Sequence, residues 1–329
     1  AYTLSVGGSA CVAGNAAFTG AVNLGAVGNI TISGTGAVLG NVLTYGASGT
    51  LCWAPASAST SAATATTLGT VYGVPCSDAT CNTGYGYCAL SAVNTSALDN
   101  TAVGMRALGA LITGSCNTAI GSRALACTGT GSYNTAVGVN SMCALTTGTQ
   151  NTAIGVGALR NTTAGSYNTA LGLNALQSNS LGCLNTAVGI GALTSNTTGN
   201  NNFAGGYCAM TSNTTGVHNI GIGVASLKTN SNGNYNIAIG SCALCALSGG
   251  SYNIGIGYCS GNALTSGSYN VILGSNSGVG IATSSCNVLI SDGSGNVAVL
   301  FNSCGSASFG ANAGTFGTAG QLRGCWYSW

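Results

Sequence analysis

Charged residues are nearly absent from this sequence. Of 329 residues only five are Lys or Arg and three are acidic, and all three acids are aspartates. Binding to nucleic acid needs a basic surface that neutralises phosphate groups, so the composition argues against a nucleic-acid partner. It argues in the same way against binding to an anionic membrane surface. Ser, Thr, Asn and Gln must therefore supply most of the solvated surface.

Large side chains and prolines are scarce as well. Aromatic residues make up 6% of the chain and Pro occurs only twice, whereas Gly occurs 55 times. The hydrophobic fraction of 46% is mostly Ala, Val, Leu and Cys. Such small side chains do not fill a conventional globular core, but they suit the narrow core of a chain that coils upon itself. No run of about 18 apolar residues occurs, so we expect no membrane insertion.

The groups that carry out catalysis are too dispersed to form a site. Asp78, Asp99 and Asp292 lie far apart, so we expect no carboxylate pair for glycoside hydrolysis. The one histidine, His218, has no acid in the neighbouring repeats that could complete a triad, and it is expected to be a surface corner residue. The sequence therefore predicts no enzyme activity, no catalytic residue and no cofactor.

Asparagine recurs at a constant interval through most of the chain. Each copy follows the one before it by seventeen positions, and Asn82 begins an earlier copy with one additional residue. The regular copies are Asn100, Asn117, Asn134, Asn151, Asn168, Asn185, Asn202, Asn219, Asn236, Asn253, Asn270 and Asn287. This regularity identifies the segment as a repeat array.

Other positions keep the same period and define the consensus N-T-A-[IV]-G-x-x-A-L. Gly follows the Asn by four and by fourteen positions, Ile or Val follows it by three, and Leu or Met follows it by eight. Each repeat thus contains two short apolar segments, which fit strands of three to five residues and do not fit a helix. Gly is expected to supply positive φ angles at the corners.

The repeat predicts an all-β fold, a parallel β-helix or β-roll solenoid in which one seventeen-residue repeat forms one coil. Stacking places equivalent residues about 4.8 Å apart, so the Asn side chains are expected to form a hydrogen-bonded ladder. A coil this slim has a thin core. We therefore expect an intertwined homotrimer in which the Ile/Val and Leu rows face a shared axis.

Two further rows bear on function. Tyr235, Tyr252 and Tyr269 precede the Asn of three successive repeats, so they form a strip that either stacks on the sugar rings of a host-surface glycan or supports the corner. Arg106 and Arg123 also share one repeat position and should point into water, with no function assigned.

Cysteine is unusually frequent, with 16 residues. Cys88, Cys208, Cys242 and Cys259 occupy one repeat position, which favours free thiols packed as small apolar groups. A disulfide between Cys242 and Cys259 on adjacent coils is the alternative. The motif Cys242–Cys245 is a single CxxC without a second pair, so we expect no metal site.

The array occupies residues 82–291 and has different segments on either side. Residues 1–50 alternate apolar and polar residues and are expected to form a looser β shaft. Residues 51–81 contain both prolines and a Ser/Ala/Thr run, which is typical of a connector. Residues 292–329 are expected to form a C-terminal β segment, with a turn at Asp292–Gly295.

The repeat resembles the coils of trimeric autotransporter adhesin heads and, more closely, the tail-fibre and virion appendage proteins of tailed phages of the cyanophage type. Three segments are similar to the phage proteins: Leu68–Gly73 before the array, Asn287–Val297 at its end, and Phe316–Gln321 followed by Trp326. The resemblance covers residues 68–326. It implies a homotrimer at the virion surface, bound to other tail or capsid proteins and attached to a host surface.

These observations leave three hypotheses. The first is a structural phage fibre that serves host attachment, and the second is a bacterial trimeric surface adhesin, which needs a membrane anchor that this chain does not show. The third is an ice-binding solenoid, suggested by the row of Thr residues from Thr101 to Thr186. That row continues as Phe203, Ile220 and Ile237, which disfavours a flat Thr surface.

Overall fold

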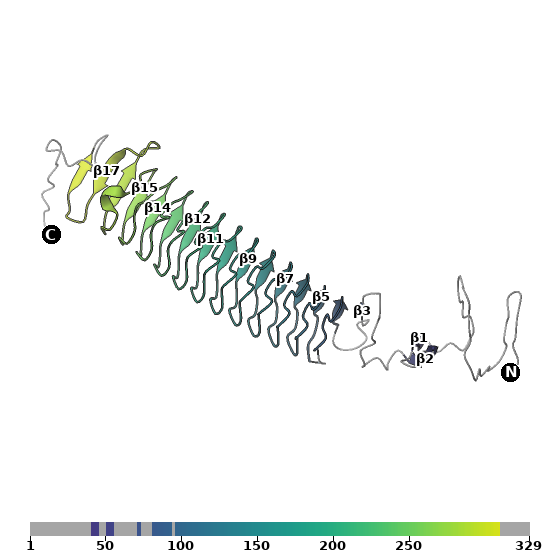
Figure 1. Ribbon diagram of the computed structural model, residues 1–329. Coiled ribbons are helices and arrows are strands. Elements are labelled where there is room, and N and C mark those ends of the chain that lie inside the picture. The colour runs from purple at the N-terminus through teal and green to yellow at the C-terminus, as the bar shows by residue number, and fades with distance from the viewer. Residues whose placement is uncertain (1–40, 46–50, 56–70, 74–80, 94–95, 310–329) are drawn as a thin grey trace, which may run out of the picture. The chain divides into compact units, whose positions relative to one another are not determined.

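The chain divides into two units, Ala1–Ala65 and Thr66–Trp329. In the first unit, β1 (Asn41–Tyr45) and β2 (Leu51–Pro55) pair as antiparallel strands. The rest of the expected N-terminal shaft lies outside the described residues, as do Phe316–Gln321 and Trp326. The computed structural model describes residues 41–45, 51–55, 71–73, 81–93 and 96–309 (Figure 1).

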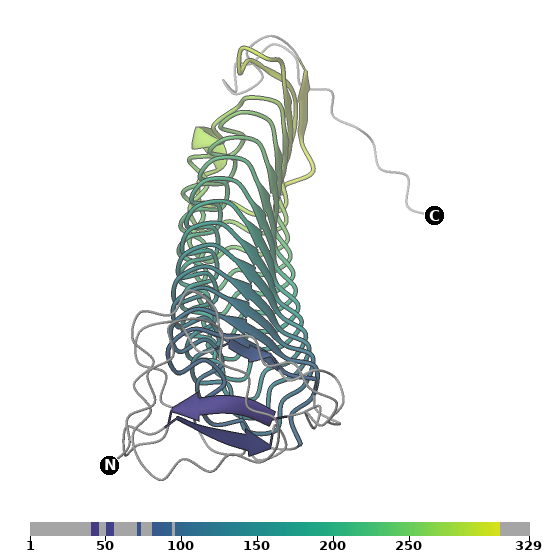
Figure 2. The ribbon, with the colours of Figure 1, turned by 90° about the vertical axis from the view of Figure 1, so that its right-hand side faces the viewer.

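The second unit contains a 16-stranded sheet in which the strands follow chain order. Its central strands are parallel, and each pairs in register with the equivalent residues of the repeats before and after it, as Thr169 pairs with Thr186. This confirms the predicted parallel β-solenoid (Figure 2). The parallel strands of the regular array are β4 (Thr83–Tyr85), β5 (Thr101–Val103), β6 (Thr118–Ile120), β7 (Thr135–Val137), β8 (Thr152–Ile154), β9 (Thr169–Leu171), β10 (Thr186–Val188), β11 (Phe203–Gly205), β12 (Ile220–Ile222), β13 (Ile237–Ile239), β14 (Ile254–Ile256) and β15 (Val271–Leu273).

Each coil contributes one strand of three residues, and the second apolar segment of the repeat forms a turn. The middle residue of the strand, usually Ala, points inward and is buried, while the residues on either side of it point outward. The second segment contributes a buried Ala and a buried Leu or Met, such as Ala158 and Leu159. The prediction that the Leu row lies on an axis shared between chains is wrong, because these side chains fill the core of the single chain.

The Asn ladder runs through this core. At Asn151, the backbone N–H and the side-chain Nδ2 both donate to Oδ1 of Asn134, at 3.0 and 3.1 Å. Nδ2 also donates to the carbonyl of Gly165 in its own coil, at 2.9 Å. Oδ1 of Asn151 in turn accepts two hydrogen bonds from Asn168. The same pattern links Asn82 to Asn100 and continues to Asn287, so each buried amide within the ladder ties three coils together.

A second ladder, absent from the sequence prediction, occupies one core position in four successive coils. It consists of Asn179, Asn196, Asn213 and Asn230, all fully buried. Asn196 donates to Oδ1 of Asn179 at 2.8 Å and to the carbonyl of Gly199 at 3.0 Å. In other coils the same position holds a buried Leu or Thr instead. The same core position is therefore filled by an apolar side chain in some coils and by a hydrogen-bonded amide in others.

The two Gly rows have different roles. Gly121 has φ 133°, and a Cβ added there would lie 2.6 Å from the carbonyl oxygen of Gly138 in the next coil. Gly131 belongs to the second row and does not have a positive φ, but its Cβ would also meet a backbone oxygen, that of Gly148, at 2.5 Å. The expectation of positive φ therefore holds for the first row, whereas the second row is Gly because successive coils approach closely.

Antiparallel strands close the two ends of the stack. At the start of the second unit, β3 (Val71–Gly73), within the expected connector, pairs antiparallel with β4. After the 3₁₀ turn η2 (Val279–Ile281), β16 (Val288–Ser291) is followed by antiparallel β17 (Val297–Phe301) and β18 (Ala307–Phe309). Chain reversal at the end of a solenoid prevents further coils from stacking.

The turn between β16 and β17 is the one expected from the sequence. The carboxylate of Asp292 accepts hydrogen bonds from the backbone N–H groups of Ser294 and Asn296 and from the side-chain amide of Asn296. These hydrogen bonds stabilise the carboxylate and lower the pKa of Asp292, and the bond from the Asn296 side chain has the largest effect.

The ladder predicts that Asn151→Asp destabilises the stack although the side chain keeps its shape. A carboxylate has no N–H, so the acceptors on Asn134 and Gly165 each lose the Nδ2 donor. Loss of such buried hydrogen bonds costs about 1–3 kcal/mol each. We expect a lower midpoint of thermal unfolding and faster amide hydrogen exchange in the flanking coils. Gln150→Asn, a change at the exposed neighbouring position, should leave both measurements unchanged.

Candidate functional site

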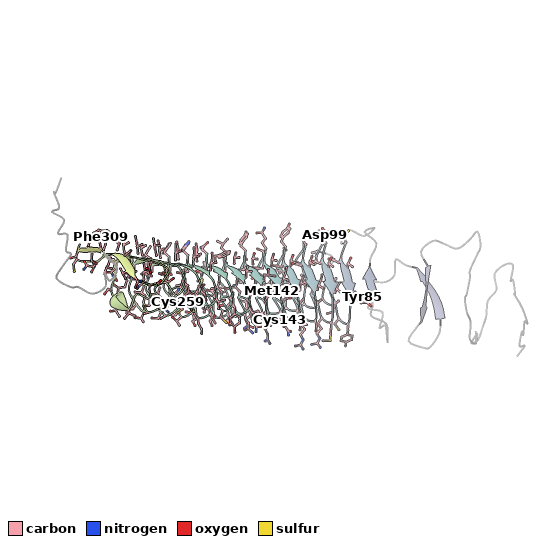
Figure 3. All side chains as sticks on the ribbon, turned by 90° about the horizontal axis from the view of Figure 1, so that it is seen from above. Tyr85, Asp99, Met142, Cys143, Cys259 and Phe309 are labelled. Atoms are coloured by element: carbon pink, nitrogen blue, oxygen red, sulfur yellow. The ribbon has the colours of Figure 1, made fainter. Side chains whose placement is uncertain are left out.

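Two outward-facing features distinguish one side of the solenoid from another. The first, here called the apolar face, consists of the first and third residues of the parallel strands β4 to β16. Its third-residue row is exposed along the array and includes Val103, Ile120, Ile154, Leu171, Val188, Ile222, Ile239, Ile256 and Ile290. Tyr85, at the start of this row, and Phe309 lie near opposite ends of the described stack in Figure 3. The row is thus a largely exposed apolar stripe on a regular sheet, interrupted only at Gly205 among the described strands.

The first-residue row of the apolar face changes in character along the chain. It is Thr in each strand from β5 to β10, and it is Phe203, Ile220, Ile237, Ile254 and Val271 in the strands from β11 to β15. The third-residue row is apolar throughout apart from Gly205. The half of the face nearer the C-terminus therefore presents apolar side chains at both outward positions. None of these residues is charged.

Exposed apolar side chains also occur immediately beside this face. They stand two residues after the third strand residue, and Tyr207 and Ile190 are examples, with 57% and 52% of their surface exposed. Large exposed apolar patches are typical of interaction surfaces.

The second feature, here called the aromatic stack, lies at a different corner. His218, Tyr235, Tyr252 and Tyr269 stack in order with ring centroids 4.8, 4.9 and 4.9 Å apart and interplanar angles of 8° or less. Each of these residues directly precedes an Asn of the first ladder and has φ between 57 and 60°. The ladder therefore sets the ring spacing. The repeat spacing places His218 and the three tyrosines at one repeat position, and the structure shows that the four rings stack.

This geometry limits how the stack could contact a sugar. Neighbouring rings are too close to admit another ring between them, so the inner ring faces already contact each other. What remains accessible is the ring edges, the Tyr hydroxyl groups and the outer faces of the two end rings. Tyr235, Tyr252 and Tyr269 have 45, 46 and 58% of their surface exposed. A glycan bound here would therefore contact edges and hydroxyl groups rather than lie flat on each ring.

The Cys row is not part of the core. Cys88, Cys208, Cys242 and Cys259 are half-buried and have left-handed φ between 52 and 56°. Their thiols are free, as the sequence predicts. The expectation that they are packed as fully buried apolar groups is wrong, because the corner turns them toward the surface. Arg106 and Arg123 occupy the same row and are exposed, as expected.

The described residues contain no cluster of three His, Cys, Asp or Glu side chains placed to hold a metal ion. Asp99 directly precedes the ladder residue Asn100, and Asp292 lies in the turn after β16, so the structure does not bring them together. Asp78 lies outside the described residues. Within the described part of the chain, no helix is long and apolar enough to cross a membrane.

Comparisons of this chain with protein-family models, with curated proteins and with solved structures found no match.

The aromatic stack predicts that Tyr252 contributes to stability more than an isolated Tyr in the same row. Tyr252 contacts a ring on each side, and each such pair contributes about 0.5–1.5 kcal/mol. Tyr252→Ser should therefore lower the thermal midpoint, and Tyr252→Phe should restore it. Tyr167→Ser is the matched control, since its row neighbours are Gln150 and Leu184. Equal destabilisation by both Ser variants would contradict a stabilising stack.

Proposed function

We propose that this chain is a structural fibre protein that serves attachment to a host surface. The observation that carries the proposal is the in-register stack of short coils from β4 to β15, tied together by buried amides. Such a stack resists bending and offers long outward rows of equivalent side chains. A fibre needs both properties.

We further propose that three copies assemble through the apolar face. Its rows carry no charge, so identical faces meet without repulsion, and the even spacing of the coils lets rows on different copies interdigitate. Burial of apolar surface stabilises association by about 25 cal/mol per Å² before the costs of association. In the proposed trimer the Ile/Val row faces the shared axis, while the Leu row belongs to the core of each chain.

The proposed setting is the tail fibre or appendage of a phage virion, in contact with other tail or capsid proteins. Support comes from the N-T-A-[IV]-G-x-x-A-L repeat and from the flanking segments Leu68–Gly73 and Asn287–Val297, which are similar to those of such proteins. The aromatic stack is the proposed contact for a host-surface glycan, through its edges and hydroxyl groups. Binding of the labelled protein to an array of immobilised glycans would test this contact.

The trimer predicts that charge introduced on the apolar face prevents assembly. Ile239→Asp combined with Ile256→Asp places two carboxylates on adjacent strands of this face. The unaltered protein should have a mass in solution three times the 31.6 kDa of the chain, and the variant should be monomeric and folded. The control, Thr198→Asp combined with Thr215→Asp, places the same charges on exposed corner residues of adjacent coils and should remain trimeric.

A trimer that survives the paired Ile substitutions would remove the apolar face from the interface. The composition of the face adds a second expectation, because the apolar residues are concentrated after β10. Ile237→Thr with Ile254→Thr should weaken the trimer. Thr118→Ile with Thr135→Ile should strengthen it.

If the protein is part of a phage tail fibre or appendage, antibodies raised against the 82–291 array should label virions. Immunogold electron microscopy of phage particles carrying this gene should show label on tail fibres or appendages. Label on bacterial cell surfaces instead, with none on particles, would favour a bacterial trimeric adhesin over a phage fibre.

A further inference from the structure

Three thiols gather on two adjacent coils near the C-terminal end of the array. Cys242 and Cys245 belong to the coil that follows β13, and Cys259 belongs to the coil that follows β14. Cys242 and Cys259 each stand three residues after paired strand residues, Ile239 and Ile256. All three are half-buried, and Cys259 is labelled in Figure 3.

The register of the coils sets the separation of Cys242 and Cys259. The backbone N–H of each donates to the coil before it, Cys242 to Val224 at 2.8 Å and Cys259 to Ser241 at 2.9 Å. Their φ angles, 56 and 52°, are nearly the same, so the two residues repeat one another at the strand spacing of about 4.8 Å. Cα atoms joined by a disulfide are usually about 4.4–6.8 Å apart.

Cys245 completes the group. Its thiol donates to the carbonyl oxygen of Asn262 at 4.0 Å. Burial, followed by the neighbouring thiols Cys242 and Cys259, raises the pKa of Cys245. A thiolate is the nucleophile in disulfide formation, so the raised pKa slows the oxidation of Cys245 near neutral pH.

We propose that Cys242 and Cys259 form a disulfide that links the two coils, with Cys245 remaining as a neighbouring thiol able to exchange with it. The oxidant is a small-molecule disulfide, written RSSR. The thiolate of Cys242 attacks RSSR, releases RS⁻ and forms a mixed disulfide. The thiolate of Cys259 then attacks the Cys242 sulfur and releases the second RS⁻. Two protein thiols are oxidised, and one RSSR is reduced to two RSH.

The bond closes a short loop of one coil and joins two coils that are otherwise held by hydrogen bonds. It therefore stabilises the folded stack by restricting the unfolded chain. The side chains leave equivalent backbone positions in parallel, at a spacing of about 4.8 Å that lies just beyond the usual Cβ–Cβ range of about 3.5–4.5 Å, so the bond must draw the two corners slightly together. A disulfide under such constraint is reduced readily, which suits exchange with Cys245.

Peptide mapping tests the proposal. The purified reduced chain is treated with oxidised glutathione at pH 7.5, remaining thiols are alkylated, and the protein is unfolded and digested with chymotrypsin. Cleavage after Tyr252 separates Cys242 and Cys245 from Cys259, so the inter-coil bond joins a peptide before Asn253 to one that contains Cys259. A Cys242–Cys245 bond involves only peptides that end at or before Tyr252, even where the enzyme also cuts after Leu244, and the peptide masses distinguish the two cases. We expect the joined pair of peptides, with Cys245 alkylated.

Substitutions of single cysteines by Ser identify which two cysteines form the bond. The joined peptides should disappear in Cys242→Ser and in Cys259→Ser and persist in Cys245→Ser. Cys208→Ser is the matched control, because Cys208 shares the row but Ala225 separates it from Cys242, and it should not change the product. Full alkylation of Cys242 and Cys259 after oxidation, or a bond from Cys242 to Cys245 alone, would overturn the proposal. Either result leaves the fibre proposal unaffected, because the readout is covalent and does not depend on assembly.

Discussion

Each coil of this protein is tied to the next by the side-chain amide of a buried asparagine. The amide oxygen accepts from the following Asn, and the amide nitrogen donates both to the preceding Asn and to a Gly carbonyl of its own coil. The bonds form only if successive coils lie one strand spacing apart and in register. A buried amide that lost its partners would be costly, so the ladder disfavours every other register.

Because the register is constant, each repeat position becomes a row with one environment. Ala and Leu rows fill the interior, where the small Ala side chains allow such a short repeat to close into a coil. The remaining rows face solvent, and their chemistry can vary from coil to coil without loss of the fold. The apolar face and the aromatic stack are two such rows or groups of rows. In this architecture, binding surfaces can therefore be built from rows of equivalent side chains on successive coils.

The sequence predicts the architecture well because the period is visible in every copy. It identifies the ladder asparagines and the turn at Asp292. It also predicts a strand in each of the two apolar segments of a repeat, but only the first forms a strand and the second is a turn. It does not show which way the Leu row points, because Leu159 and its equivalents have left-handed backbone angles, 50° in φ at Leu159, that ordinary strand alternation does not anticipate. The second ladder was missed for another reason. Asn179 to Asn230 occupy a position that holds Leu or Thr in other coils, so no single residue type marks it.

The candidate site was only partly predictable for similar reasons. The spacing places His218, Tyr235, Tyr252 and Tyr269 on successive coils, but only the ring geometry shows that the rings stack and that their faces are mutually covered. The cluster at Cys242, Cys245 and Cys259 depends on the proximity of Cys245 to the other two thiols, which the spacing alone does not establish.

A cryo-electron microscopy map of the purified chain is the most direct measurement of the ladder on which this account depends. Cα atoms of ladder asparagines in successive coils should be about 4.8 Å apart, with unbroken side-chain density between them. A map in which these residues lie far apart, or in which the array is helical, would contradict the account.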